Sequence, residues 1–193
     1  MKPRLHVFAL TALVVSLIAG PAVAQGVPPA GEPGQHTLVF RSLEDPRIPD
    51  HPKGCPFPGA NLLLGATLWS LDTRASDSRV VNEAIHQIGT ASACGLITTA
   101  LTPGALAPFY IEFTFDQGPG KGGTFIALGI CRVITNDVPR PGVELVGCAL
   151  HVTQGPDGFL GGVATSMSIF NPLLLPGAGT GSFWTLRAYT TGN

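Results

Sequence analysis

Runs of apolar residues of strand length recur along the chain, and segments dense in Gly, Pro, Asn and Asp separate them. The clearest alternation is in residues 109–116 (FYIEFTFD), where Phe or Ile occupies every odd position and Tyr, Glu, Thr or Asp every even one. This period of two is typical of a strand with one buried face. The chain therefore reads as a series of strands joined by turns.

The central part, residues 124–167, contains three apolar runs separated by two turn-rich breaks, which predicts an antiparallel meander. Residues 73–78 form a polar turn, and residues 80–88 fit either two helical turns or an edge strand. The pattern predicts an all-β fold of about eight strands, either an antiparallel barrel or a β-sandwich. The barrel requires residues 36–42 or 66–72 to pair with residues 182–189. The predicted strands are residues 36–42, 66–72, 89–100, 109–116, 124–133, 143–152, 159–167 and 182–189.

The first residues have the features of a secretory signal peptide. Lys2 and Arg4 precede an apolar run at residues 7–19, which is too short to span a bilayer, and Ala22-Val23-Ala24 matches a cleavage site. We expect a signal peptide at 1–24, a flexible Pro/Gly linker at 25–35 and a single β-barrel domain at 36–193. The predicted location is secreted, either extracellular or periplasmic.

The charge and composition of the chain argue against some classes of binding partner. The formal net charge of −1 becomes −3 when Lys2 and Arg4 are removed, and no basic run is present, so nucleic acid is an unexpected partner. No second apolar stretch approaches membrane-spanning length. Hydrophobic residues make up 45% of the chain, which is enough to fill a core despite 25 Gly and 18 Pro.

Four cysteines in an exported chain favour two disulfides over a metal site. Three connectivities are possible in principle. If residues 134–142 form the loop between two neighbouring strands, Cys131 and Cys148 lie nearly opposite each other. This arrangement leaves Cys55, in a proline-rich loop, to pair with Cys94.

No motif for enzymatic chemistry stands out. Ser92 lacks the flanking glycines of a nucleophile elbow, and Lys121 is followed by Gly122 rather than the Ser or Thr of a phosphate-binding loop. The histidines lack metal-ligand spacing, so we expect neither a metal nor a cofactor.

The expected ligand site is a pocket inside the barrel, where small residues such as Gly129, Gly161, Gly162 and Ala164 would leave room. Glu112 and Phe113 point to opposite faces, and Phe113 is expected inside because a small barrel must fill its centre. Each of the other candidates is an isolated polar residue within an apolar strand. The candidate pocket residues are Glu112, Phe113, Arg132, His151 and Arg187.

The segments ALGICRV, VGCALHVTQGPDGFLGGVATSMSIFNP and SFWTLRAY resemble the calycin-like barrel of dirigent proteins and allene oxide cyclases. That family has a Gly-Gly-Thr-Gly-x-Phe type of turn followed by a Gly/Ala strand, which residues 154–162 resemble, although Pro156-Asp157 replaces Gly-Thr. The resemblance covers residues 65–190. It implies an eight-stranded barrel that holds a hydrophobic small molecule, and a homotrimer. The acidic and basic residues of dirigent pockets have no match here, so no catalytic residue is transferred.

Three functions follow from these observations. The leading hypothesis is a secreted, dirigent-like barrel that binds or guides a hydrophobic small molecule. The first alternative is an isomerase or cyclase of the allene oxide cyclase kind, with a pocket carboxylate such as Glu112. The second is a structural cell-surface module without a ligand. The sequence does not decide whether the protein is an enzyme.

Overall fold

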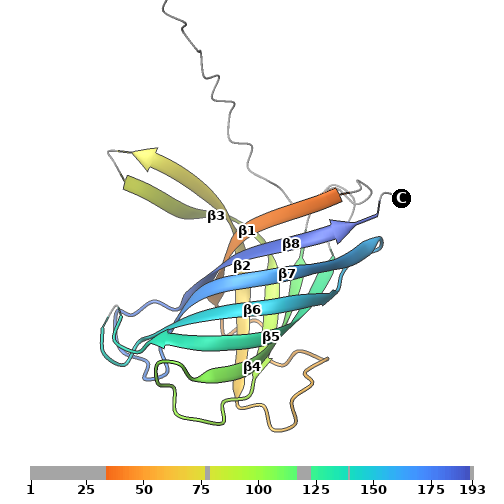
Figure 1. The fold of residues 1–193 in the computed structure, drawn as a ribbon. Coiled ribbons are helices and arrows are strands. Elements are labelled where there is room, and N and C mark those ends of the chain that lie inside the picture. The colour runs from red at the N-terminus through yellow and green to blue at the C-terminus, as the bar shows by residue number, and fades with distance from the viewer. Residues whose placement is uncertain (1–33, 77–78, 117–122, 139, 192–193) are drawn as a thin grey trace, which may run out of the picture.

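The computed structural model describes residues 34–76, 79–116, 123–138 and 140–191, and these residues contain strands but no helix. The strands form one closed antiparallel barrel in chain order (Figure 1). No helix in this part of the chain is long and apolar enough to cross a membrane. The strands are β1 (Gly34–Glu44), β2 (Leu62–Ser76), β3 (Arg79–Gly95), β4 (Leu106–Phe115), β5 (Thr124–Thr135), β6 (Glu144–Gln154), β7 (Phe159–Phe170) and β8 (Gly181–Thr190).

Pairing between the first and last strands closes the barrel. Gly34 to Ser42 of β1 run antiparallel to Ser182 to Thr190 of β8, with Leu38 opposite Leu186 at the middle of the pair. Within the barrel, every strand therefore has two neighbours, which removes the open edges that a sandwich would retain there. The prediction of an eight-stranded antiparallel barrel is confirmed, and the sandwich alternative is wrong.

The strands are longer than predicted at several ends. Gly34 and Gln35, assigned to the linker, are the first residues of β1. Residues 73–76, predicted as a turn, continue β2, and residues 80–88 belong to β3 rather than to a helix. Together they extend the β2–β3 hairpin away from the barrel (Figure 1). The predicted signal peptide and residues 25–33 of the linker lie outside the described residues.

Aromatic side chains fill the centre of the barrel. Phe113 has no exposed surface, and its ring meets the edges of Phe40 and Trp184 at centroid distances of 5.3 and 5.0 Å. Edge-to-face contacts of this kind add to the free energy gained by burial. The expected position of Phe113 inside the barrel agrees with this core.

The small residues of the central strands do not leave a lumen. A Cβ added to Gly129 would lie 2.3 Å from the carbonyl oxygen of Ala149, and one added to Gly162 would lie 2.3 Å from that of Arg187. These glycines instead permit close approach of neighbouring strands. Gly129 and Gly162 therefore do not make the room that was expected of them inside the barrel.

Two disulfides fix the barrel, Cys55–Cys94 and Cys131–Cys148, and the described residues include no free cysteine. This is the pairing that the sequence favours. Cys131 and Cys148 are direct partners in the β5–β6 register, which explains why they meet. Cys94 faces the outside of β3, where it holds the proline-rich β1–β2 loop.

Candidate ligand-binding site

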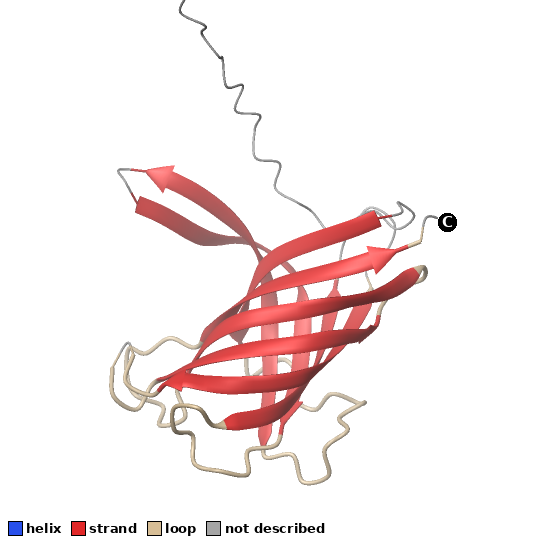
Figure 2. Cartoon of the chain, in the orientation of Figure 1, coloured by secondary structure: helices blue, strands red, loops and turns tan. Residues whose placement is uncertain are grey.

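A cavity of about 90 Å³ lies at one end of the barrel. Its walls come from the last residues of β1, β5 and β7 and the first residues of β2, β4, β6 and β8. At this end, four long connections join the strands, and Figure 2 shows these loops gathered along the lower side of the molecule. The lining is predominantly apolar and includes Leu62, Leu64, Ile97, Leu101, Ala107, Phe109, Val133, Val146, Ile169 and Trp184.

Trp184 separates the cavity from the packed centre of the barrel. Its side chain is 3% exposed, lines the cavity and contacts Phe113, which does not. The indole Nε1–H donates a hydrogen bond of 3.1 Å to Oγ of Ser42, so its only polar group is satisfied. The Cys131–Cys148 disulfide forms part of the same wall. The inner end of the cavity is therefore held by a covalent bond and a buried hydrogen bond.

Two asparagines hold the loops that surround the cavity mouth. Asn61 exchanges hydrogen bonds with the backbone of Ile97, which fixes the start of the β3–β4 loop. Asn171 accepts from the N–H of Leu175 and donates to the carbonyls of Leu175 and Ala178 in the β7–β8 loop. Such side-chain to backbone bonds restrain a loop that has no ladder of its own.

Two carboxyl groups interrupt the apolar lining, Glu44 at the end of β1 and Glu144 at the start of β6. Glu144 is 5% exposed, and its Oε2 has no hydrogen-bond partner among the described residues. Burial raises the pKa of Glu144. Burial also raises the pKa of Glu44, although a hydrogen bond with the Thr180 side chain acts in the opposite direction. Glu144 is therefore a buried carboxyl group whose charged form is disfavoured, whereas Glu44 lines the cavity from an exposed position.

The five predicted pocket residues all lie elsewhere. Phe113 belongs to the aromatic core, and the other four face the outside of the barrel. Arg132, His151 and Arg187 are exposed because each follows a buried residue on its strand, namely Cys131, Leu150 and Leu186. Strand alternation therefore directs all three away from the interior.

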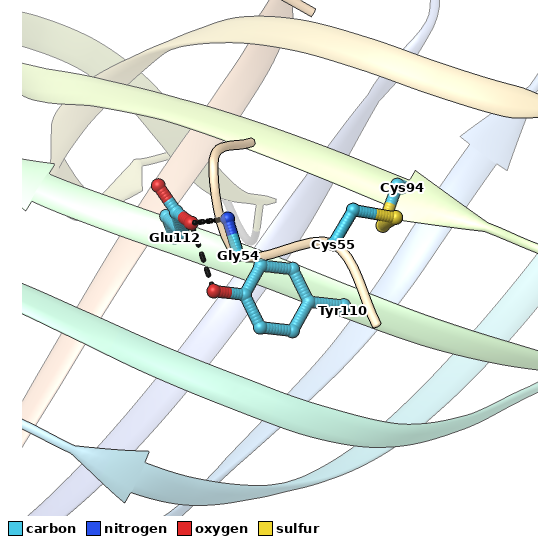
Figure 3. Close-up of a disulfide and its surroundings, with 5 residues drawn as sticks. All are labelled: Gly54, Cys55, Cys94, Tyr110 and Glu112. Atoms are coloured by element: carbon cyan, nitrogen blue, oxygen red, sulfur yellow. Dashed lines mark hydrogen bonds between the residues drawn. A yellow bond between two sulfur atoms is a disulfide. The ribbon is translucent and has the colours of Figure 1, made fainter. Parts of the chain in front are cut away.

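Glu112 faces outward but is not free in solvent. Its Oε1 accepts hydrogen bonds from the backbone N–H of Gly54 at 3.1 Å and from the Tyr110 hydroxyl at 2.8 Å, beside the Cys55–Cys94 disulfide (Figure 3). Desolvation, and then the bond to Glu112, raise the pKa of Tyr110, which keeps its hydroxyl a donor. Glu112 therefore holds the β1–β2 loop against β4 and does not line the cavity.

The sequence indicates that Glu144 faces the interior, although Glu144 was not among the predicted pocket residues. Glu144 lies four residues before Cys148, so both residues share one face of β6. If Cys148 faces the interior, Glu144 must do so as well. Glu44 shares one face of β1 with Phe40 and Ser42, but it lies beyond the strand predicted at residues 36–42.

Comparison of the chain with protein-family models, curated proteins and solved structures finds no match. The resemblance to dirigent proteins and allene oxide cyclases therefore stays a prediction. Among the residues that the structure describes, no group of three or more His, Cys, Asp or Glu side chains is arranged to hold a metal ion.

The buried carboxyl of Glu144 predicts a pH-dependent stability. Because its pKa is raised above the ordinary 4.5 in the folded protein, its favourable contribution is complete below pH 4.5 and is lost as the pH rises through the folded pKa. Glu144→Gln removes the ionisation. We expect this variant to exceed the wild type in unfolding free energy by about 1 kcal/mol or more at pH 7.

Urea unfolding between pH 4 and pH 8 measures this difference. The advantage of the variant over the wild type should shrink toward the acidic end of the range, where both side chains are neutral. A difference that stays constant over this range would contradict the burial of an ionisable carboxyl group.

Proposed function

We propose that this protein is an exported barrel that binds a small apolar molecule in the cavity at the loop end. The observation that carries the proposal is the cavity itself, which is apolar over most of its wall and contains a few polar groups. Ligand sites in proteins commonly have this composition, and the mouths of β-barrels are among their usual positions. Trp184 and the Cys131–Cys148 disulfide give the site a fixed inner wall.

The volume favours a small ligand or a small part of a larger one. A cavity of about 150 Å³ holds benzene in other proteins, and pockets for drug-sized molecules are several-fold larger. At about 90 Å³, this cavity fits a short alkyl group or part of a ring. The remainder of the ligand would contact apolar residues of the lining nearer the mouth, such as Leu101, Leu106 and Ile169.

Export is supported by the disulfides and by the predicted signal peptide. Disulfides persist in oxidising compartments, and all four cysteines are joined in two such bonds. The dirigent-like resemblance points to the same kind of protein, a secreted barrel that holds or guides a hydrophobic molecule.

The lining favours binding over a structural module without a ligand. The isomerase or cyclase alternative keeps a candidate carboxyl group inside the cavity, Glu144 in place of Glu112. A ligand-free structural module gives no reason for a carboxyl group without a hydrogen-bond partner beside an apolar cavity. The homotrimer implied by the resemblance stays a prediction, and the exposed Met167 and Phe183, opposite each other on β7 and β8, provide apolar surface for it.

Isothermal titration with ethylbenzene tests the proposal. Ala107 lines the cavity, so Ala107→Leu adds methyl groups to its interior. Ala149 is exposed on β6, and Ala149→Leu makes the same chemical change outside the barrel. We expect saturable binding to the wild type and to Ala149→Leu, and binding weakened about tenfold or more in Ala107→Leu, because the added side chain occupies the ligand's space.

Equal affinity in all three proteins would place the bound molecule elsewhere and reject the proposed site. Absence of saturable binding to the wild type would reject the proposed function. Thermal unfolding of each variant checks that Ala107→Leu remains folded at the temperature of the titration.

A further inference from the structure

Resting on the proposed function, we propose that the ligand is a cation: a small apolar amine whose ammonium group is held by Glu144, with Glu44 as the second carboxyl group. The apolar part of the amine occupies the space between Trp184, Val133 and Val146.

The carboxyl group of Glu144 is buried beside the cavity. A buried carboxyl oxygen without a hydrogen-bond partner is unfavourable, and native proteins seldom retain one without a reason. Glu144 lines the cavity while its Oε2 is unpartnered among the described residues. Because the last torsion of a Glu side chain is broad, a small rotation can present either oxygen to a ligand. A donor in the cavity would satisfy this oxygen.

The charges in the cavity wall indicate whether the ligand's hydrogen-bond donor is part of an anion or a cation. Among the described residues that line the cavity, two are Glu and none is Lys, Arg or His. An anionic ligand would be repelled by ionised carboxylates and would meet no cation in the wall. A cation would meet the buried Glu144, where the attraction is stronger than in bulk solvent, and the exposed Glu44, where water weakens it.

An ammonium group also has enough hydrogen-bond donors to serve the acceptor oxygens of the carboxyl groups. It has three N–H donors, whereas an alcohol has one O–H donor. Hydrogen bonds that join two charged groups are shorter and about twice as strong as neutral ones. Glu144 is already withdrawn from water in the folded protein, so binding adds only the cost of withdrawing the ammonium group.

A series of ligands with one shape and different head groups tests the inference. Ethylbenzene, benzyl alcohol and benzylamine have nearly the same size, and benzylamine is protonated at pH 7. Phenylacetate provides the anion. We expect benzylamine to bind the wild type about tenfold or more tightly than ethylbenzene or phenylacetate, and more tightly than benzyl alcohol.

Glu144→Gln should weaken benzylamine binding about tenfold while changing ethylbenzene binding less than about twofold. Glu44→Gln is the second variant and should weaken benzylamine binding in the same direction. Glu112→Gln is the matched control, because it makes the same chemical change at a glutamate outside the cavity. It should retain the affinity of the wild type for both ligands.

The outcomes separate this inference from the proposed function. If ethylbenzene binds and is displaced from the cavity by Ala107→Leu, but benzylamine binds no better, the site stands and the amine class is wrong. Preference for benzyl alcohol or phenylacetate over benzylamine would also overturn the inference. If neither ethylbenzene nor benzylamine binds, both proposals fail.

Discussion

Phe113→Ala is expected to lower the free energy of unfolding by about 3–5 kcal/mol, as for other large aromatic side chains deleted from a packed core. Phe113 has no exposed surface, and its ring touches Phe40 and Trp184 in edge-to-face contacts. Deletion removes the burial of the ring and leaves a void that closed strands cannot fill by moving together. Urea unfolding of the oxidised protein measures the loss.

Thr114→Ala is the control for this change. Thr114 is the next residue on β4 and is exposed, with a hydroxyl contact to Thr124 across the sheet. Its loss should cost about 0.5 kcal/mol, which is typical of surface positions. A loss below about 1 kcal/mol for Phe113→Ala would mean that the barrel centre is not packed as described.

Removing the Cys55–Cys94 disulfide through Cys55→Ala and Cys94→Ala should lower the free energy of unfolding by about 4 kcal/mol. The bond spans 39 residues of sequence, and a longer loop loses more conformational freedom when it is closed in the unfolded chain. The middle of the β1–β2 loop would keep weaker attachments, such as Gly54 to Glu112 and the Ser92 hydroxyl to the Pro49 carbonyl at 2.6 Å.

The second disulfide provides the comparison. Cys131–Cys148 spans 17 residues, and the same chain-entropy relation gives about 3 kcal/mol for its removal. Denaturant unfolding of the two double variants should therefore rank Cys55–Cys94 as the larger contributor. Limited proteolysis should cut the β1–β2 loop faster only in the first variant. Unchanged cleavage there would mean that the hydrogen bonds alone hold the loop.

Most of the fold could be predicted because strand alternation is a local property. The alternation of residues 109–116 places Phe113 and Glu112 on opposite faces, and the need to fill a small barrel places Phe113 inside. The β5–β6 disulfide follows from a turn of predictable length. The reach of β3 back to Arg79 could not be predicted, because its pairing with β2 continues past the part of β3 that pairs with β4.

Less of the candidate site could be predicted from the sequence, because the site depends on contacts between segments that are distant in the chain. Arg132, His151 and Arg187 attract attention as polar residues within apolar strands, yet alternation alone places them outside. Glu112 is held by Gly54, 58 residues away, which no local pattern reveals. Glu44 and Glu144 line one cavity only because β1 and β6 contribute to the same end of a closed barrel.

The central claim is that the cavity between Trp184 and the loop end receives an apolar ligand. The most direct measurement is the detection of intermolecular nuclear Overhauser effects between ethylbenzene and the methyl groups of the protein. The account predicts cross-peaks to Val133 and Val146, which line the cavity, and none to Val163, which is exposed on the outer face of β7. Cross-peaks to Val163 without those to Val133 and Val146 would contradict it.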